Sequence, residues 1–379
     1  MYCIGLMSGT SLDAVDGVLA CFAPHGAKVI AHASRPLPPS LRSELLALNR
    51  SGPDELRRAA LAANALADLY ADVVASVLHA AGLSRNAIQA VGAHGQTVRH
   101  APENGYTWQL NAPARLAERT GIAVIADFRS RDVAAGGHGA PLVPAFHHAV
   151  FAGPRQRVLL NLGGIANVSV LPGLEESAAD ADASGAGGVG GFDTGPANML
   201  LDLWCERHLG QPYDRDGAWA ASGRANPDLC SFLYQSEPWF ASPPPKSTGR
   251  DRFHADWLDD RLAEYERRRG AVTPTDVQAT LLELTALSAA RAIRDAAPKA
   301  AEVFVCGGGA ANPVLMSALA KRLPGCTVQS TEALGVPPQQ VEALAFAWLA
   351  RAHLLGEAGN VPAVTGAAGP RVLGARYPA

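Results

Sequence analysis

Two segments of the chain share one pattern that strongly restricts the fold: an apolar strand, a tight glycine-containing turn and a second apolar strand. The first segment comprises residues 2–22 and the second comprises residues 157–172. Each segment predicts a β-hairpin. Strand and helix patterns alternate after each hairpin, which indicates an α/β fold with a mostly parallel sheet. Because each half opens with the same hairpin, we predict two duplicated α/β domains that close on a cleft.

The periodicity of apolar residues locates the main helices. Apolar residues recur at three- and four-residue spacing through residues 40–82, where Gly82 is well placed to end a helix. Further helices are expected at 113–120, 197–208, 273–296, near 313 onward and at 340–355. Polar and glycine-rich loops follow the strands, at the edge where open α/β sheets bind ligands. We interpret residues 173–191 as a hairpin tip or surface loop.

Composition excludes several classes of protein. A chain of 379 residues exceeds the size of a usual single core, so two domains are expected. The net charge of −3 comes without a basic block, which argues against nucleic-acid binding. No signal peptide and no membrane-spanning run of about 20 apolar residues is expected. The six cysteines form no CxxC, which favours reduced thiols in a cytoplasmic protein.

Three glycine-containing turns directly follow apolar strands: SGTSLDAVD (8–16), NLGGIANV (161–168) and CGGGAANP (306–313). Glycine lets the backbone approach a ligand closely, and successive N–H groups in such turns bind anions. The hydroxyls of Thr10 and Ser11 would add donors for phosphate, and Asp13 or Asp16 would hold a hydrated Mg²⁺. One such turn alone is more often a simple tight turn, but three together favour a nucleotide site. No GxxxxGK[ST] occurs, so a P-loop is excluded.

Asp193 is the leading candidate for the carboxylate that phosphoryl transfer needs near its nucleophile. We expect it to follow a strand end, with Gly191, Gly195 and Pro196 shaping the turn and a helix starting at Ala197. The same pattern is also typical of an aspartate that caps a helix or forms an Asx-turn.

Polar residues also follow other strands. Asp127 and Arg129 come after the strand 122–128, and the planar guanidinium of Arg129 suits a carboxylate or a phosphate. An exposed ion-pair cluster explains them equally well. His94 and Gln96 end another strand, where either would face a substrate, although a structural histidine is an equal alternative.

Three further features stay open. Glu342 lies near the start of an apolar helix, which is typical of a solvated first-turn residue. His147 and His148 are adjacent, but no third ligand stands at a useful spacing, so no zinc site is expected. The loop 245–253, PKSTGRDRF, would either close over a substrate or brace the edge of a domain.

Nine ordered segments, from the first strand to the last residues, resemble the anhydro-N-acetylmuramic acid kinase family. They read GLMSGTSLDAVD, GAHGQTVRH, ADFRSRDVAAGGHGAPLVPAFH, LNLGGIANVS, GFDTGPANMLLD, YDRDGAWAASG, PKSTGRDRF, CGGGAANPVL and VTGAAGPRVLGARYP. The resemblance implies an α/β fold of two actin/hexokinase-like (ribonuclease H-like) domains around an interdomain nucleotide cleft. We expect domain I at residues 1–139 plus about 358–379, and domain II at residues 140–357.

The resemblance also implies that ATP lies in the cleft, with phosphate loops at 9–16 and 162–167 and with 307–312 beside the adenosine. The nucleotide-binding residues would be Gly9, Thr10, Ser11, Asp13, Asp16, Gly163, Gly164, Asn167, Gly307, Gly308, Gly309 and Asn312. Asp13 would hold Mg²⁺ through water. The family usually reads GTSxDGxD, whereas Ala14 replaces the glycine here. If that position requires a positive φ, alanine would be strained by about 1 kcal/mol.

The activity that the resemblance implies is ATP-dependent conversion of 1,6-anhydro-N-acetylmuramic acid, in cell-wall sugar recycling. Asp193 would activate a water that attacks the anomeric carbon, and the freed O6 would take the γ-phosphate, giving N-acetylmuramate 6-phosphate and ADP. Glu342 would lie near that water. The implied catalytic residues are Asp193, Glu342 and Arg129, and the implied substrate-binding residues are Asp127, Arg129, His94, Gln96 and Glu342. A cytoplasmic homodimer is implied, with no nucleic-acid or membrane partner.

Fold alone does not separate this activity from others on the same architecture. An ordinary sugar kinase acting on another amino sugar and a polyphosphate-type phosphatase are open alternatives. A non-enzymatic nucleotide switch of the actin or chaperone type is another.

Overall fold

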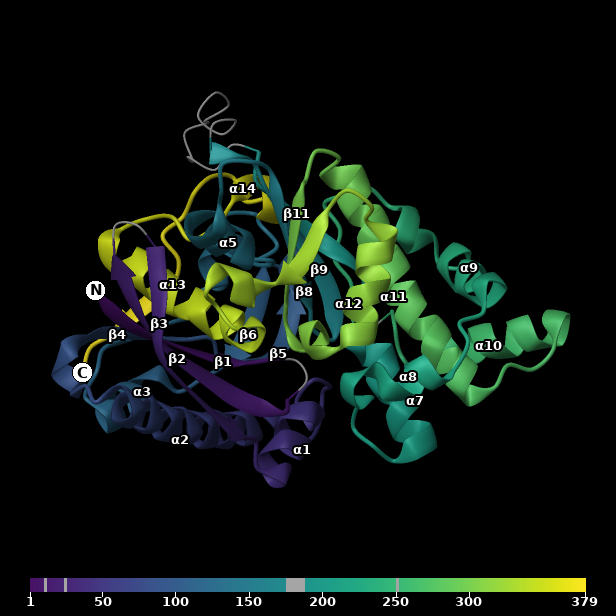
Figure 1. Cartoon of the computed structure of the whole chain (residues 1–379). Helices are drawn as coiled ribbons and strands as arrows, with labels where there is room; N and C mark the ends of the chain where they lie inside the picture. Colours follow the sequence, from purple (N-terminus) through teal and green to yellow (C-terminus); the bar gives the residue numbers. More distant parts are fainter. Residues whose placement is uncertain (10–11, 24–25, 175–187, 250–251) are drawn as a thin grey trace. The chain divides into compact units, whose positions relative to one another are not determined.

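The computed structural model describes residues 1–9, 12–23, 26–174, 188–249 and 252–379, and the chain divides into two compact units (Figure 1). Unit 1 comprises Met1–Phe151, Ala181–Val189 and Gln340–Ala379, and unit 2 comprises Ala152–Asp180 and Gly190–Gln339. Thr10 and Ser11 lie outside the described residues, as does most of the predicted surface loop 173–191.

Unit 1 is built on a six-stranded sheet with the order β13-β7-β4-β1-β2-β3, and a separate hairpin is formed by β5 and β6. Its strands are β1 (Tyr2–Ser8), β2 (Ala14–Ala23), β3 (Gly26–Pro36), β4 (Ile88–Ala93), β5 (Gln96–Ala101), β6 (Tyr106–Leu110), β7 (Val124–Ala126) and β13 (Ala375–Tyr377). Its helices are α1 (Pro39–Ala47), α2 (Glu55–Ala81), α3 (Pro113–Thr120), α4 (Ser130–Ala134), α5 (Val143–Phe151), α13 (Val341–Leu355) and α14 (Pro362–Thr365).

Unit 2 is built on a five-stranded sheet with the order β10-β9-β8-β11-β12. Its strands are β8 (Arg157–Leu162), β9 (Ile165–Leu171), β10 (Gly190–Pro196), β11 (Glu302–Cys306) and β12 (Thr327–Ser330). Its helices are α7 (Asn198–Leu209), α8 (Ala218–Ser222), α9 (Pro227–Gln235), α10 (Ala255–Arg269), α11 (Pro274–Ala296) and α12 (Pro313–Arg322). The buried face of α11 packs in the core of this unit with β8, β9 and β11.

The two sheets have the same topology. In unit 1, β2 is antiparallel to β1 and to β3, whereas β4 is parallel to β1 and β7 is parallel to β4. In unit 2, β9 is antiparallel to β8 and to β10, whereas β11 is parallel to β8 and β12 is parallel to β11. This repeat confirms the predicted duplication of α/β domains. By the direction of the described strands, each sheet is mostly parallel, as expected: β9 alone runs against the other four strands of unit 2, and β2 and β13 run against the other four of unit 1.

Helix α13 packs directly on the backbone of the unit 1 sheet. A Cβ added to Gly5 of β1 would lie 1.9 Å from the carbonyl oxygen of Ala343, and one added to Gly92 of β4 would lie 2.1 Å from that of Phe346. Ten of the fifteen residues of α13 are buried, as its apolar pattern predicts. Only glycine permits this approach of helix and strand backbones.

The predicted domain boundaries differ from the two units. Residues 140–151 and 340–357 were expected in domain II, but α5 and α13 both belong to unit 1. The apolar surface of α13 showed that the helix would be buried, but it did not identify the sheet on which the helix packs.

Two local features of the first hairpin were also not foreseen. Strand β3 was missed because Val29 and Ile30 are its only β-branched residues, and it also contains three alanines, a glycine, a lysine and a proline, which are depleted in strands. Ala14 lies in β2, opposite Pro36, and among the described residues of this turn it is Leu12 that has a positive φ, of 58°. The strain considered for Ala14 therefore does not arise.

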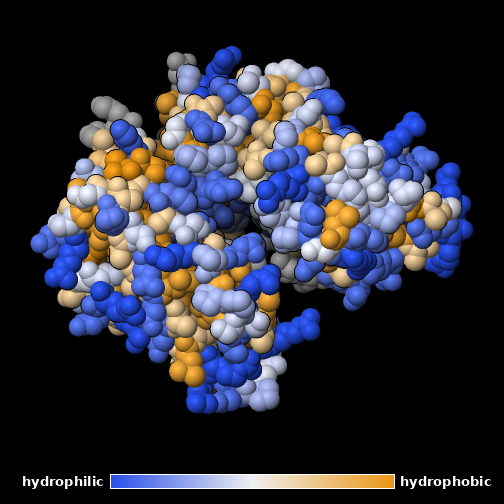
Figure 2. Space-filling view, turned by 60° about the horizontal axis from the view of Figure 1, so that its bottom comes forward, coloured by the Kyte–Doolittle hydropathy of each residue, from blue (hydrophilic) through white to orange (hydrophobic). Residues whose placement is uncertain are grey.

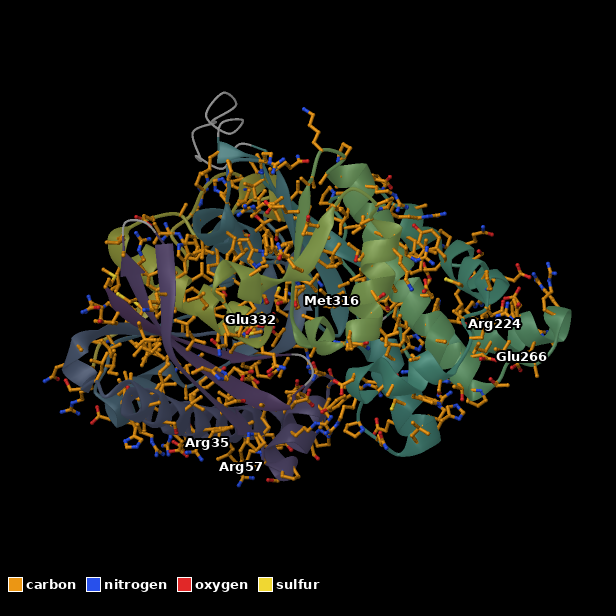
Figure 3. The ribbon with its side chains drawn as sticks, viewed as in Figure 1. Arg35, Arg57, Arg224, Glu266, Met316 and Glu332 are labelled. Carbon is orange, nitrogen blue, oxygen red and sulfur yellow. The ribbon has the colours of Figure 1, made fainter. Side chains whose placement is uncertain are left out.

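Helix α2 covers the hairpin and contributes to the unit 1 core. Its buried residues include Leu66 and Tyr70. Arg35 of β3, which is labelled in Figure 3, donates to Ser76 of α2 at 3.0 Å. By length and composition α2 is apolar enough to cross a membrane, but core helices of globular units also satisfy that test. Hydrophilic and hydrophobic residues are intermixed on the face shown in Figure 2.

We expect Gly5→Ala and Gly92→Ala each to lower the free energy of unfolding by about 3 kcal/mol, because the added methyl group must displace α13 from the sheet. Denaturant unfolding measures the change. Gly52→Ala is the matched control, since its Cβ would meet only the flexible end of Arg58, at 3.2 Å. Equal stability of the Gly5 and Gly52 variants would contradict the close packing of α13.

Candidate active site

The turn between β8 and β9 is fixed by the start of α7. The carbonyl oxygen of Leu162 accepts from the side-chain amide of Asn198 at 3.0 Å. The carbonyl oxygen of Gly163 accepts from the backbone N–H of Asn198 at 3.0 Å, and that of Gly164 accepts from Ala197 and Met199 at 3.0 and 3.2 Å. Three successive carbonyl groups of the turn therefore point toward α7.

The orientation of these carbonyl groups sets the orientation of the neighbouring amides. In a trans peptide the C=O of one residue and the N–H of the next point in opposite directions. The N–H groups of Gly163, Gly164 and Ile165 therefore point away from α7. Convergent amides of this kind bind phosphate oxygens, which fits the predicted phosphate loop.

The turn after β11 packs against the same region. Gly307 has φ 78°, and a Cβ there would lie 2.3 Å from Oδ1 of Asn161 and 2.8 Å from the carbonyl oxygen of Leu162. A Cβ on Gly309 would lie 2.6 Å from Cβ of Leu162 and 3.2 Å from Oδ1 of Asn198. The structure therefore brings the predicted phosphate loop and adenosine loop of unit 2 together, with Asn198 between them.

Two predicted nucleotide-binding asparagines are placed differently. Asn312 caps α12, since its Oδ1 accepts from the N–H groups of Val314 and Leu315 at 3.1 and 3.0 Å. Asn167 lies in β9 opposite Asp193 of β10. Because paired residues of antiparallel strands project to the same face, Asn167 and Asp193 share one face of the sheet.

In unit 1, the residues of the first hairpin lie at the end of β1. Gly9 accepts from the N–H of Leu12 at 3.2 Å, which closes the turn. The side chain of Asp13 is exposed, and Oδ1 of Asp16 lies 3.3 Å from Nε2 of His32.

Asp193 lies within β10, so the expectation that it follows a strand end was wrong. The pairing of β10 with β9 shifts register between Asp193 and Gly195, and Gly195 has φ 145°. Such a β-bulge commonly redirects a side chain at a functional site.

The loop 245–253 holds the Asp193 carboxylate on one oxygen. Oδ2 of Asp193 accepts from the hydroxyl of Ser247 and from the N–H of Thr248, each at 2.9 Å. Burial raises the pKa of Asp193 to about 6, although the Thr248 N–H, the Ser247 hydroxyl and the charge of Lys246 oppose the rise. The carboxylate is therefore a stronger base than an exposed aspartate and is still mostly ionised at neutral pH.

Lys246 and Trp239 anchor this loop. The ammonium group of Lys246 lies 4.6 Å from the centroid of the Trp239 ring and donates to the carbonyl oxygen of Phe240 at 3.0 Å. The indole N–H of Trp239 donates to the carbonyl oxygen of Ser247 at 3.1 Å. The loop thus braces Asp193 from within unit 2.

In unit 1, Arg129 and His94 form a pair. Nε and Nη2 of Arg129 lie 3.2 and 3.0 Å from Nε2 of His94, and Nη1 donates to the carbonyl oxygen of Gly139 at 2.7 Å. Burial, together with the charge of Arg129, lowers the pKa of His94 to about 3. Neutral His94 must accept through Nε2, which places its ring proton on Nδ1.

Glu342 and Gln96 complete this part of unit 1. The pKa of Glu342 is raised above its usual value, mainly by burial. The charge of Arg129 opposes this rise, and the charge of Asp16 adds to it. Oε1 of Gln96 accepts from the hydroxyl of Ser8 at 2.6 Å, in a buried contact. The first turn of α13 thus brings Glu342 into the electrostatic field of both Arg129 and Asp16.

Asp127 lies apart from this cluster. It has φ 59°, is exposed, and its Oδ1 accepts from the hydroxyl of Ser130 at 2.5 Å. With Ser130 it lines a polar cavity of about 200 Å³ whose other lining residues are Thr107, Trp108, Gln109, Asn111, Pro113, Ala126 and Tyr377. Neither Arg129 nor Glu342 lines this cavity, and among the described residues Asp127 has no hydrogen bond or ion pair with any other predicted sugar-binding residue.

Sequence reasoning assigned no role to Asn198, and it did not connect Ser247 or Thr248 of the loop 245–253 with Asp193. Asn198 acts on a turn 36 residues earlier in the chain, and Ser247 on a carboxylate 54 residues earlier. The hydroxyl-rich PKST segment was the available signal for the second contact.

No zinc site was expected at the adjacent His147 and His148. His147 is buried in α5, where its ring packs against Phe146 and Phe151. Across the described ranges, no group of three or more His, Cys, Asp or Glu side chains could hold a metal ion.

Duplicated sheets that share one strand order, each opening with a hairpin, place the chain in the actin/hexokinase-like fold class. The whole chain, residues 1–379, matches the family model of anhydro-N-acetylmuramic acid kinase. This protein belongs to the anhydro-N-acetylmuramic acid kinase family.

Two curated relatives carry that family name. The protein from Bordetella petrii is 59% identical over 99% of this chain and 96% of its own length. The protein from Bordetella pertussis is 58% identical over 99% of this chain and 96% of its own length. Among solved structures, component A of (R)-2-hydroxyglutaryl-CoA dehydratase from Acidaminococcus fermentans aligns with a TM-score of 0.48 at 13% identity, covering 92% of this chain and 96% of that one.

We expect Asp193→Asn to unfold at a higher denaturant concentration than the wild type at pH 8, and at an equal concentration near pH 4. The folded-state pKa of about 6 exceeds the ordinary value of 3.8, so ionised Asp193 destabilises the fold fully above pH 6. That cost is lost as the pH falls from 6 toward 3.8. Unfolding midpoints between pH 4 and 8 measure the difference.

Asp276→Asn is the control, for which we expect the opposite effect on stability. Hydrogen bonds from the Arg224 N–H and then from Thr273 lower the pKa of Asp276, so this variant should be less stable than the wild type from pH 5 to 8. A stability difference for Asp193→Asn that does not change between pH 4 and 8 would contradict the raised pKa.

Proposed function

We propose that this protein is an ATP-dependent kinase that opens the 1,6-anhydro ring of 1,6-anhydro-N-acetylmuramic acid and phosphorylates O6, giving N-acetylmuramate 6-phosphate and ADP. Membership of the family supports the kinase activity and the sugar substrate. The single observation that carries the chemistry is the position of Asp193. Its carboxylate has a raised pKa and lies on the strand that adjoins the glycine turn at 162–164.

The base in this reaction is Asp193. Within the described residues, its hydrogen bonds fall on Oδ2, so Oδ1 accepts the proton of the attacking water. The water oxygen bonds to the anomeric carbon, and the bond from that carbon to O6 breaks with its electron pair on O6. O6 then attacks the γ-phosphorus of ATP, and the β,γ-bridging oxygen leaves on ADP. Capture of O6 by phosphorus removes the need for a separate general acid, unlike in glycosidases, which use two carboxylates.

The nucleotide would bind the turns of unit 2. The amides of Gly163 and Gly164 point away from α7 and would contact phosphate oxygens, and Gly307–Gly309 would lie beside the adenosine. Mg²⁺ would neutralise phosphate charge, and the exposed carboxylate of Asp13 fits a water-mediated contact to it.

The sugar would bind the cluster of unit 1. Arg129 would bind the lactyl carboxylate through N–H groups that His94 and Gly139 leave uncommitted. Glu342 would orient the attacking water on its side of the sugar. We further propose closure of the cleft around both substrates, a homodimer and a cytoplasmic location, for which the six free cysteines are suited.

A reaction with the anhydro sugar, ATP and Mg²⁺ in H₂¹⁸O tests the proposal. We expect one ¹⁸O atom at the anomeric carbon of the product and none in its phosphate group, because water attacks carbon and O6 attacks phosphorus. Mass analysis of fragments locates the label. Unlabelled N-acetylmuramate 6-phosphate incubated in the same solvent controls for exchange at the anomeric position.

Asp193→Asn should lower kcat about 10³-fold with both ligands still bound, since general-base catalysis contributes that much. Label-free product would overturn the mechanism. An ordinary sugar kinase would leave the anhydro sugar unphosphorylated, and a nucleotide switch would release ADP at a rate that does not depend on the sugar.

We expect Asn198→Ala to raise the KM for ATP about tenfold and to leave the KM for the sugar unchanged, because it releases the carbonyl group of Leu162 and loosens the phosphate turn. Steady-state kinetics in both substrates measure the effect. Asn226→Ala is the control, since it removes the cap of α9 at 3.0 and 3.1 Å and should lower only stability. An unchanged KM for ATP in Asn198→Ala would exclude this role.

A further inference from the structure

A buried carboxylate in unit 1 has no role in the predicted site. Asp132 of α4 is completely buried. Its Oδ1 accepts from the side-chain amide of Asn360 at 2.6 Å and from the hydroxyl of Thr365 at 2.8 Å, and its Oδ2 accepts from the N–H of Gly139 at 2.8 Å. Within the described part of the chain, it forms no salt bridge. The nearby charge of Arg129 interacts with it electrostatically, because the Asp132 charge opposes the lowering of the Arg129 pKa by burial. No cation of the described residues contacts the carboxylate directly, so its hydrogen bonds must be well formed.

The residue that Asp132 binds also holds Arg129. The N–H of Gly139 donates to Asp132, and the C=O of Gly139 accepts from Nη1 of Arg129 at 2.7 Å. The position of Gly139 is restricted, because its φ is 69° and a Cβ would lie 2.8 Å from Cγ2 of Val133. One residue therefore transmits the position of the carboxylate to the guanidinium.

The other oxygen of Asp132 is tied to the C-terminal segment. Asn360 and Thr365 are both buried, and the carbonyl oxygen of Thr365 accepts from the N–H of His138 at 2.7 Å. Oδ1 of Asn360 accepts from the N–H of Arg371 at 2.7 Å. Asp132 thus connects the turn 136–139 to Asn360 and Thr365, which lie 228 and 233 positions after Asp132 in the chain.

Arg129 has few N–H groups left for a ligand. A guanidinium carries five N–H groups in a rigid plane. Contacts to Nε2 of His94 engage Nε and Nη2, and the contact to Gly139 engages Nη1. The remaining N–H groups of Nη1 and Nη2 form a fork whose direction depends on both contacts.

We propose that Asp132 is a positioning residue for Arg129: through Gly139 it fixes the guanidinium so that the free fork faces the carboxylate of the sugar. This inference rests on the proposed role of Arg129 in sugar binding. Asp132 itself touches no substrate. Its effect on catalysis is therefore carried entirely by Arg129.

A double-mutant cycle of Asp132→Asn and Arg129→Lys tests the inference. The carboxamide of Asp132→Asn keeps an oxygen for Asn360 and Thr365 but turns its NH₂ group toward the N–H of Gly139, which displaces the turn. We expect kcat/KM for the anhydro sugar to fall about tenfold or more, since small misplacements of a binding group have large effects. In the Arg129→Lys background the same substitution should change kcat/KM less than about twofold, a coupling typical of directly linked residues.

Thr365→Val is the matched control. It removes a donor from the same carboxylate but leaves the contact with Gly139, so it should lower the Tm while kcat/KM stays within about twofold of the wild type. If Asp132→Asn does not fold, Gly139→Ala replaces it in the cycle. That variant displaces the same turn through its Cβ and leaves Asp132 intact.

The outcomes separate the two proposals. An unchanged kcat/KM in Arg129→Lys would overturn the proposed role of Arg129 in sugar binding. A reduced kcat/KM in Arg129→Lys with an equal effect of Asp132→Asn in both backgrounds would overturn the positioning role alone. A loss of kcat/KM in Thr365→Val as large as that in Asp132→Asn would also overturn it, because stability would then explain both.

Discussion

The packing of α13 on the bare backbone of β1 and β4 is the contact on which the unit 1 site depends. The carbonyl oxygen of Ala343 would meet a Cβ on Gly5, and that of Phe346 would meet a Cβ on Gly92. These two helix residues lie about one turn apart on the same face of α13. Glu342 immediately precedes Ala343, and the Phe346 ring lies 4.7 Å from the His94 ring, centroid to centroid. The close approach that glycine permits therefore fixes both the height of Glu342 above the sheet and the environment of His94.

Unit 2 organises its site by a different contact on the same topology. The first residues of α7 bind the carbonyl groups of the β8–β9 turn, so a helix start that commonly binds anions is used instead to orient a loop. In the proposed mechanism, the amides of this loop bind the phosphate instead. Strand β10 leads from Asp193 into α7, so one short segment carries both the proposed base and Asn198, which orders the predicted phosphate turn.

The sequence predicts those parts of the fold that depend on local pattern. The duplicated hairpins and helix α3 were predicted because turn glycines and apolar periodicity act over a few residues. The sheet that covers α13 and the strand position of Asp193 were not, since both depend on tertiary pairing. Asp132 looked like part of a charged RSRD cluster, and its partners lie 228 and 233 residues away. The site residues were named through family resemblance, whereas their supports became visible only in three dimensions.

The acid and base groups of the two units are held in protonation states that suit their proposed tasks. Burial raises the pKa of Asp193 but leaves it ionised at neutral pH, as a base requires. Burial keeps His94 neutral, and this neutrality is essential to Arg129, because a protonated His94 would place two cations in contact. Burial also lowers the pKa of Arg129, to about 10. Because this value is still well above neutral pH, the guanidinium remains charged. Arg129 can therefore share donors with His94 and still present a positive fork to an anion, which an exposed, titrating histidine at position 94 would not allow.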